Sequence, residues 1–362
     1  MKILKTFLII FLFSKEIRAQ FPASDPTFSL MLNDHFSGPS LNTTKWYDKY
    51  IWGNVNNGDE YNDPANLTFT TTSGQTYLSI KCETMTPMYY YRQDYPVNDP
   101  YNDTLHFRSG AIYSKTKYKY GYWEISAKLP AGAKGYWPAF WLWDAPGTMT
   151  ACPTGSDNIV NEIDIVENGG GDSQYTDHMG TNYHWRDASC NYGSLAGGLL
   201  PATIIVPANV TQEHKYAMLW EPGKMTWYFD DVPVKIINDP ANTPSYPLST
   251  IINFAIDPPN WNAPISGATP FPARFEINYI NVWQLQPDCN TNVSFCSNFN
   301  AGTYISKVKK SITIGGSGCS DNINTSSNVN FWATDYILIT QGTTITANGS
   351  GSFSANITNC PN

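Results

Sequence analysis

Three carboxylates fall within one short segment of the chain, residues 161–168 (NEIDIVEN). The isoleucines and the valine between the acids favour a β-strand. Regular alternation places Glu162 and Asp164 on one face of such a strand and Glu167 on the other. One extra residue, a β-bulge, would bring Glu167 to the face that carries the other two acids. The segment therefore predicts a bulged strand with three acids in a row.

Carboxyl groups arranged in this way can hydrolyse a glycosidic bond. Hydrolysis with retention of configuration needs two carboxyls about 5–5.5 Å apart, one as the nucleophile and one as the general acid/base. Crowding of carboxyls on one face raises the pKa of at least one of them and makes them titrate as a coupled set. A solvent-facing acidic edge strand is the alternative interpretation of this segment taken alone.

Aromatic- and glycine-rich segments flank the acids on both sides. In chain order they are residues 41–46 (LNTTKW), 108–112 (RSGAI), 120–130 (YGYWEISAKLP), 135–143 (GYWPAFWLW), 220–230 (WEPGKMTWYFD) and 275–283 (FEINYINVW). Together with the acidic strand, this ordered set resembles glycoside hydrolase family 16. The five-residue spacing from Glu162 to Glu167 is similar to the bulged branch of that family, which includes laminarinases and agarases. Lichenases and xyloglucan-acting members have a spacing one residue shorter.

The resemblance implies a role for each acid. It makes Glu162 the nucleophile, Glu167 the general acid/base and Asp164 the helper between them. This division is chemically reasonable, because the nucleophile must be ionised while the acid must hold a proton near neutral pH.

The resemblance also suggests residues that bind substrate. Trp137 and Trp141 lie four positions apart in a strand-like stretch, so they share a face, and indole rings can stack on the apolar faces of sugars. Core packing is the alternative role for any one of the 12 tryptophans. The further candidates for substrate binding are His184, Asn57, Arg108 and Asn253.

We therefore expect a secreted, endo-acting, retaining β-glycanase that acts on β-1,3- or mixed β-1,3/1,4-glucan, with a polysaccharide as its partner. One alternative is a β-galactanase of the agarase, porphyranase or carrageenase type. Another alternative is a glycan-binding protein without catalysis. No cofactor is required for this chemistry, and we predict no catalytic metal.

A structural calcium ion is allowed by the resemblance but weakened by two departures. The family often has Asp-Glu-Phe near its start, whereas this chain has His35 between Asp34 and Phe36. The family also often has an aspartate in its last strand, where Asn278 stands. An asparagine still offers a carbonyl oxygen to calcium, but one negative charge is lost.

Composition sets the broad class. Charged and aromatic residues each make up 14% of the chain, and the formal net charge is −8. A negative charge without basic runs argues against nucleic acid as a partner, and we expect a monomer. Short β-rich runs separated by glycine, proline and asparagine predict an all-β protein. The resemblance specifies a jelly-roll β-sandwich with a concave substrate cleft, plus a small C-terminal β module.

The chain divides into three parts by pattern. Residues 1–19 have basic residues around a short apolar run, which predicts a signal peptide and a secreted or cell-surface protein. This run is too short to span a membrane, and no longer apolar run follows it. We assign residues 20–286 to the catalytic β-sandwich and 287–362 to a disulfide-containing β module of unknown role.

The chain has seven cysteines, and the predicted export would place them in an oxidising compartment. Cys152 and Cys190 flank the acidic strand and are the best candidates for one bridge. Four more cysteines lie at or beyond Cys289, and this clustering predicts bridges within the C-terminal module. Cys82 would then be a buried free thiol.

Overall fold

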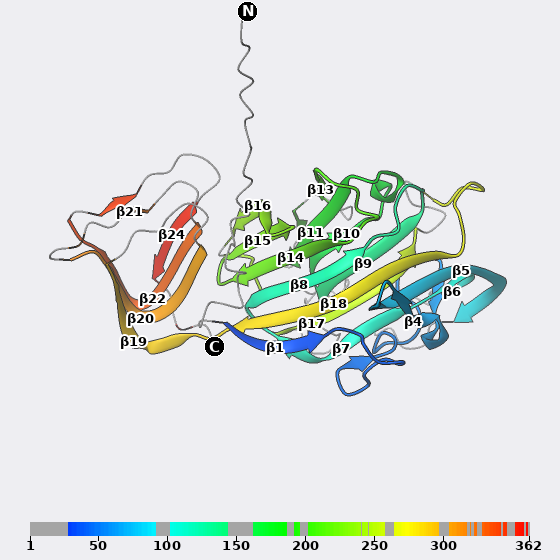
Figure 1. Cartoon of the computed structure of the whole chain (residues 1–362), viewed down its shortest axis with the longest axis horizontal. Helices are drawn as coiled ribbons and strands as arrows, with labels where there is room; N and C mark the ends of the chain where they lie inside the picture. Colours follow the sequence, from blue (N-terminus) through cyan, green and yellow to red (C-terminus); the bar gives the residue numbers. More distant parts are fainter. Residues whose placement is uncertain are drawn as a thin grey trace, which may run out of the picture. The chain divides into compact units, whose positions relative to one another are not determined.

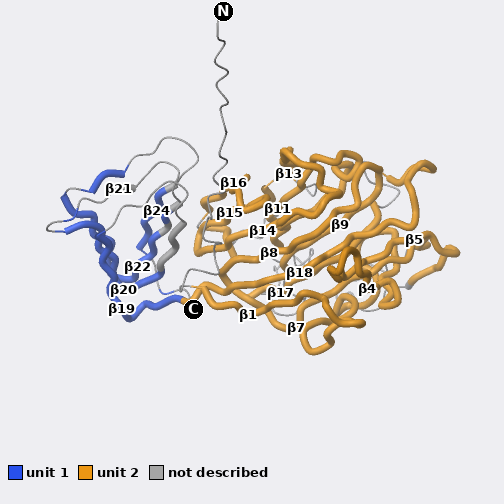
Figure 2. Tube along the Cα trace, in the orientation of Figure 1, with its two compact units in different colours: residues 1–27, 287–360, 362 blue, residues 28–286, 361 orange. Residues whose placement is uncertain are grey.

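The computed structural model describes most of the chain after residue 27. The described residues are 28–91, 102–143, 162–186, 192–195, 202–239, 241–244, 246–257, 264–296, 304–316, 319, 322–323, 328–341, 343–345, 352–357 and 360. The predicted signal peptide, Cys152 and Cys190 lie outside them. The chain forms two compact units, Phe28–Gln286 and Pro287–Cys360 (Figure 2). None of the helices in the described residues is long and apolar enough to cross a membrane.

The larger unit is a sandwich of two mainly antiparallel sheets (Figure 1). The ten-stranded sheet runs in the order β16-β15-β14-β8-β18-β5-β6-β3, with β1 added on β18 and β4 on β5. Its strands are β1 (Phe28–Asp34), β3 (Glu60–Asn62), β4 (Leu67–Thr72), β5 (Gln75–Tyr91), β6 (Asn102–Ser109), β8 (Gly121–Lys128), β14 (His214–Glu221), β15 (Lys224–Phe229), β16 (Val232–Asn238) and β18 (Ala273–Leu285).

The eight-stranded sheet carries the acidic strand near its middle. Its order is β12-β11-β10-β9-β17-β7-β2, with β13 paired to β11. Its strands are β2 (Trp46–Tyr47), β7 (Ala111–Tyr118), β9 (Tyr136–Trp143), β10 (Glu162–Glu167), β11 (His178–Arg186), β12 (Tyr192–Ser194), β13 (Ala202–Ile205) and β17 (Leu248–Ile256). Two short 3₁₀ turns, η1 (Pro64–Asn66) and η2 (Asp172–Gln174), complete the described elements of this unit. The predicted all-β sandwich is confirmed.

The central strands of the sandwich are apolar because their side chains are buried. Every residue of β9 and of β17 is buried, as expected for central strands with covered faces. Hydrogen bonds also cross the sandwich: the Trp123 indole N–H donates to the Thr250 hydroxyl at 3.1 Å. The Trp227 indole N–H donates to the Asp164 carbonyl at 2.9 Å. The second bond fixes the acidic strand β10 from its core side.

The β-bulge predicted for the acidic strand is present. Asp164 lies opposite Trp141 of β9, but the next aligned pair is Val166 with Phe140, so the register shifts between Asp164 and Val166. The extra residue is therefore Ile165. After the shift Glu167 lies opposite Ala139, two residues before Trp141, which puts Glu167 on the same face as Asp164.

The two positions associated with calcium are engaged by other protein groups. The Asp34 carboxylate accepts the backbone N–H of Phe36 at 3.0 Å and the indole N–H of Trp46 at 2.9 Å. The Asn278 side-chain oxygen accepts the amide of Gln75 at 2.7 Å. These oxygens accept hydrogen bonds from protein donors. The structural calcium stays a prediction.

The smaller unit is built from parallel strands. β19 (Asp288–Phe295), β20 (Tyr304–Ile314), β22 (Asn328–Ile339) and β24 (Ser352–Ile357) form one parallel sheet. The short strands β21 (Asn322–Ile323) and β23 (Thr344–Ile345) pair in a second parallel sheet. Tyr304 lies opposite Asn328, and Asn328 opposite Ser352, so the chain returns at equal sequence intervals, as in a repeat protein.

Two disulfides lie within this smaller unit, between Cys289 and Cys360 and between Cys296 and Cys319. The prediction of bridges in the C-terminal module is therefore confirmed. Cys82 lies in β5 of the larger unit and is a buried free cysteine, also as predicted.

Candidate active site

The three acids of β10 lie beside a histidine of the neighbouring strand. Glu162 pairs with His184 of β11, and Asp164 pairs with Asn182. The His184 Nε2 atom is 3.3 Å from the Asp164 Oδ2 atom and 3.9 Å from the Glu162 Oε1 atom. The predicted residue His184 is thus brought to the acids by the β10–β11 register.

The acids differ in their access to solvent. The side chain of Glu162 is 28% exposed, whereas Asp164 and Glu167 are buried. An attacking carboxylate must be reached by substrate, so the exposed one, Glu162, is suited to direct contact. Asp164 lies between the two glutamates and reaches His184 instead.

Trp137 holds the third acid. Its indole N–H donates to the Glu167 Oε1 atom at 2.7 Å. The other carboxyl oxygen, Oε2, is buried and has no hydrogen-bond partner among the described residues. Gly169 makes room for this ring, because a Cβ atom there would lie 2.7 Å from the Trp137 ring. The ring and the turn after β10 therefore fit together only with glycine at that position.

Neighbouring charges shift the pKa values of Glu162 and Glu167 by different amounts. Burial and the adjacent Asp164 raise the pKa of Glu162 to about 8, while the His184 imidazolium opposes that rise. Burial, Asp164 and Glu162 raise the pKa of Glu167 well above its ordinary value, and the Trp137 hydrogen bond offsets only part of the rise. Since His184 favours the charged form of Glu162 only, Glu162 ionises before Glu167.

Histidine 184 is itself held in its charged form. Burial lowers its pKa, but the Asp164 hydrogen bond and the charges of Glu162 and Asp164 outweigh burial and raise the pKa to about 9. The imidazole of His184 therefore stays cationic through neutral pH.

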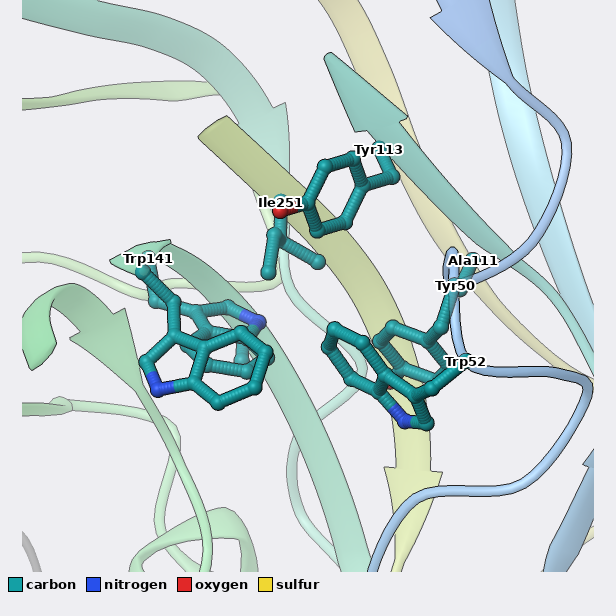
Figure 3. Packing of buried hydrophobic residues seen from close by; sticks show 8 residues of the cluster. Tyr50, Trp52, Ala111, Tyr113, Trp141 and Ile251 are labelled. Carbon is teal, nitrogen blue, oxygen red and sulfur yellow. The ribbon is translucent and has the colours of Figure 1, made fainter. Parts of the chain in front are cut away.

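Aromatic side chains continue along the face that carries the acids. Trp141 and Trp143 belong to a buried cluster with Tyr50, Trp52, Ala111, Tyr113, Ala139 and Ile251 (Figure 3). The Trp52 and Trp143 rings meet edge to face at 4.6 Å, and Tyr50 stacks on Trp52 at 4.7 Å. Packing on this face is thus mainly aromatic, and only 7–8% of each of Trp137, Trp141 and Trp143 is exposed.

Asn253 joins this face, whereas the contacts of two other predicted residues are with polar neighbours outside the acidic cluster. The Trp141 indole N–H donates to the Asn253 side-chain oxygen at 2.7 Å, so the two predicted residues support each other. Asn57 is exposed in the loop before β3, where its amide oxygen accepts from Asn56 at 3.0 Å. Arg108 lies on β6 of the ten-stranded sheet, and its guanidinium is 3.5 Å from an Asp63 carboxylate oxygen. Roles for Asn57 and Arg108 in substrate binding stay predictions.

Several residues near the acids were not found from the sequence. Asn182 lies on the same face as His184, two residues away, which alternation could have indicated. Trp52 comes from a distant loop to pack on Trp143, and Asp257 approaches the turn after β10 from the end of β17. Loop packing of this kind has no local sequence signal.

Glu162, Asp164 and His184 are the one trio of the described residues that metal-ligand spacing would permit, with ligand atoms within 4.8 Å of one another. The ionic contacts of the imidazole with the two carboxylates, at 3.3 and 3.9 Å, account for this closeness. We assign no metal to it.

The sandwich and the acidic cluster on its bulged strand define a glycoside hydrolase. The model of glycosyl hydrolases family 16 matches residues 42–281, and the chain belongs to this family.

Curated relatives match only in part. A beta-glucanase of Rhodothermus marinus is 31% identical over 47% of this chain and 59% of its own length. An endo-1,3-1,4-beta-glycanase of Rhizobium meliloti is 26% identical over 73% of this chain and 52% of its own length. The chain thus spans about half the length of the curated relatives that it matches.

Solved structures share the fold at lower identity. A laminarinase from a Flavobacterium species has a TM-score of 0.51 at 23% identity, covering 71% of this chain and all of that one (100%). The kappa-carrageenase of Pseudoalteromonas carrageenovora has a TM-score of 0.56 at 19% identity, covering 74% of this chain and 99% of that one. These similarities confirm the predicted jelly-roll fold of the larger unit.

Proposed function

We propose that the protein is a secreted, endo-acting, retaining β-glycanase that hydrolyses β-1,3- or mixed β-1,3/1,4-glucan. The observation that carries the proposal is the bulge at Ile165, which gathers three carboxylates on one face of β10. The beta-glucanase and endo-1,3-1,4-beta-glycanase names of relatives support glucan as the substrate class.

In the proposed mechanism, Glu162 attacks the anomeric carbon while Glu167 donates a proton to the departing glycosidic oxygen. A covalent glycosyl–enzyme ester forms and the leaving chain departs with the proton. Glu167, now ionised, then removes a proton from water, and the water oxygen attacks the same carbon and releases Glu162. Both steps invert the centre, so the product retains its configuration.

The neighbours serve this cycle by holding charge and orientation. His184 favours the charged form of Glu162, and Asp164 holds His184 in place at 3.3 Å. The Trp137 N–H fixes one oxygen of Glu167, which leaves the Oε2 atom to carry the proton. Trp141 packs in the aromatic cluster and is braced by Asn253, and the proposal assigns contact with a sugar ring to the 7% of this residue that is exposed.

A β-galactanase activity is the second candidate. The kappa-carrageenase shares the fold with a higher TM-score than the laminarinase, and the bulged strand is compatible with both substrate classes. The net charge of −8 makes a densely sulfated polymer the less natural ligand. A protein that only binds glycans would have no need of three clustered carboxylates, whose burial is costly.

We extend the proposal to location, assembly and domains. Two disulfides in the smaller unit support an oxidising, extracellular setting. The proposed enzyme acts as a monomer, has no nucleic-acid partner, and consists of a catalytic sandwich followed by a module whose role is open.

Reducing-sugar release from laminarin, lichenan, agarose and kappa-carrageenan, measured side by side, tests the substrate. We expect release from laminarin or lichenan as a ladder of oligosaccharides. The Glu162→Gln variant, purified in the same way, is the matched control: its release should fall to near background, and release close to that of the wild type would contradict the proposal. Release from agarose or carrageenan alone would favour the galactanase, and binding without release would favour the non-catalytic alternative.

A further inference from the structure

Asp257 is a buried acid that the mechanism above does not use. It follows β17 directly, and only 1% of the residue is exposed. Burial of a carboxyl group is costly unless hydrogen bonds replace water. The Oδ1 atom accepts the backbone N–H of Gly170 at 3.3 Å, while Oδ2 has no partner in the part of the chain that the structure describes. A half-satisfied acid at this depth calls for an explanation.

The turn that Asp257 contacts is the one that follows the proposed acid/base directly. Residues 169–171 are three glycines, and Gly170 and Gly171 have φ angles of 62° and 107°, which side chains other than glycine rarely adopt. Asn168 anchors the start of the turn by accepting the N–H of Gly180 at 2.9 Å. Asp257 anchors its middle, through Gly170.

The same turn supports the tryptophan that holds Glu167. Gly169 packs directly on the Trp137 ring, and the indole N–H of that ring donates to Glu167 at 2.7 Å. Ala255, two residues before Asp257, pairs with Trp137 across β17 and β9. Asp257 is therefore joined to Glu167 by two short routes, through the glycine turn and through the strand that carries Trp137.

We propose that Asp257 is a positioning residue for Glu167. Its carboxylate holds the glycine turn beneath Trp137, the residue that binds Glu167, and it adds a negative charge to the surroundings of the acid/base. This inference rests on the proposed function, since it concerns the acid of that reaction.

Electrostatics agree with this geometry. The groups that raise the pKa of Glu167 are, after burial, Asp164 and Glu162 from its own strand and then Asp257. His184, from β11, acts on Glu162 and Asp164. Burial raises the pKa of Asp257 itself to about 7, against the Gly170 hydrogen bond. The charge of Asp257 therefore develops through neutral pH, where Glu167 must still hold its proton.

The pH profile of kcat/KM distinguishes an effect of the Asp257 charge from a purely structural role of this residue. Glu167 must be protonated, so its pKa sets the basic limb, while ionisation of Glu162 sets the acidic limb. Asp257→Asn keeps an oxygen for Gly170 but removes the charge. We expect the basic limb on laminarin to move to lower pH by about half a unit to one unit, with the acidic limb unchanged. Asp257→Ala should show the same shift and also a lower kcat, because the turn loses its anchor.

Asp172→Asn is the matched control. Asp172 lies in η2, just beyond the same turn, and its carboxylate accepts the Thr203 hydroxyl at 2.9 Å. Its charge is not among those that raise the pKa of Glu167, so its profile should match the wild type. Equal profiles for wild type and both Asp257 variants would overturn the proposal.

A titration of Glu167 in an inactive variant tests the role of Asp257 independently of whether the enzyme hydrolyses glucan. In full-length protein carrying Glu162→Gln, the ¹³C carboxyl signals of labelled glutamates report the midpoint of Glu167, assigned by its loss in Glu167→Gln. We expect a lower midpoint when Asp257→Asn is added. An unchanged midpoint contradicts the proposal even if the enzyme hydrolyses glucan, whereas failure of all glucan hydrolysis with a shifted midpoint contradicts only the proposed function.

Discussion

Two glutamates of the larger unit show how surroundings decide the use of a carboxyl group. Glu213, at the ten-stranded sheet, accepts hydrogen bonds from Tyr77 at 2.7 Å, Ser126 at 2.5 Å and Asn278 at 2.5 Å. Burial would raise its pKa, but these three bonds outweigh burial and lower it. Glu167, at the eight-stranded sheet, has one such bond, and burial together with three nearby carboxyl groups raises its pKa.

The comparison indicates that donors, not burial alone, separate a structural acid from a reactive one. Where the fold supplies enough N–H and O–H groups, the charged form is stable and the carboxylate acts as a structural link. Where like charges crowd together and one oxygen is left without a donor, a proton is retained. Asn278 is one of the donors that stabilise the charged form of Glu213. This role needs an amide N–H, which the aspartate that the family often has at this position lacks.

The largest effect is expected at the nucleophile. Glu162→Gln keeps the shape of the side chain but cannot attack carbon, so activity on laminarin should fall by about 10⁴-fold or more. Thermal unfolding should stay close to that of the wild type. A variant that keeps a tenth of wild-type turnover would mean that Glu162 is only another structural acid, like Glu213.

Removal of the acid/base should cause a smaller loss of activity than removal of the nucleophile, and this loss should be open to chemical rescue. Glu167→Ala should lose about 10²–10⁴-fold on polymeric glucan, and less on an aryl glucoside whose leaving group needs no proton. Added azide should then attack the glycosyl–enzyme and give a β-glycosyl azide, detected by mass spectrometry. Without rescue by azide or by the better leaving group, the assignment of Glu167 would be wrong.

A shift of pH dependence is expected at His184. The imidazolium lowers the pKa of Glu162, so His184→Gln should raise that pKa and move the acidic limb of kcat/KM to higher pH. The shift should be about one unit. An acidic limb that stays in place, measured from pH 4 to pH 8 or so, would remove His184 from the control of the nucleophile.

Glu213→Gln should change stability rather than activity. The loss of charge-assisted bonds should cost about 1–3 kcal/mol in the free energy of unfolding by urea at pH 7. Because the folded pKa of Glu213 is lowered, its charge stabilises the fold above the ordinary pKa, and that contribution is lost as pH falls through the folded value. The gap between variant and wild type should therefore narrow in acid. A loss of kcat with unchanged stability would contradict the structural role.

The acidic site was predictable because its information is local. Alternation and one bulge suffice to align Glu162, Asp164 and Glu167, and the β10–β11 register adds His184. Asp257 could not be found in this way, because it reaches Glu167 only through a turn and a neighbouring strand.

The fold was predicted in part for the same reason. β-rich runs indicate strands but not their partners, so the parallel pairing of β20, β22 and β24 in the smaller unit was missed. The equal spacing of Tyr304, Asn328 and Ser352 was a usable signal of a repeat. Roles for Arg108 and Asn57 came from the resemblance alone, and the contact of Arg108 with Asp63 is long-range.

The stereochemistry of the first product tests the central claim most directly. If the bulge places Glu162 and Glu167 on one face at the separation needed for double displacement, hydrolysis must retain configuration. Proton NMR of a β-glucan digest, recorded within minutes of enzyme addition, should show the β anomer of the new reducing end first, with the α anomer growing later by mutarotation. An initial α signal would contradict the assignment of Glu162 as a nucleophile.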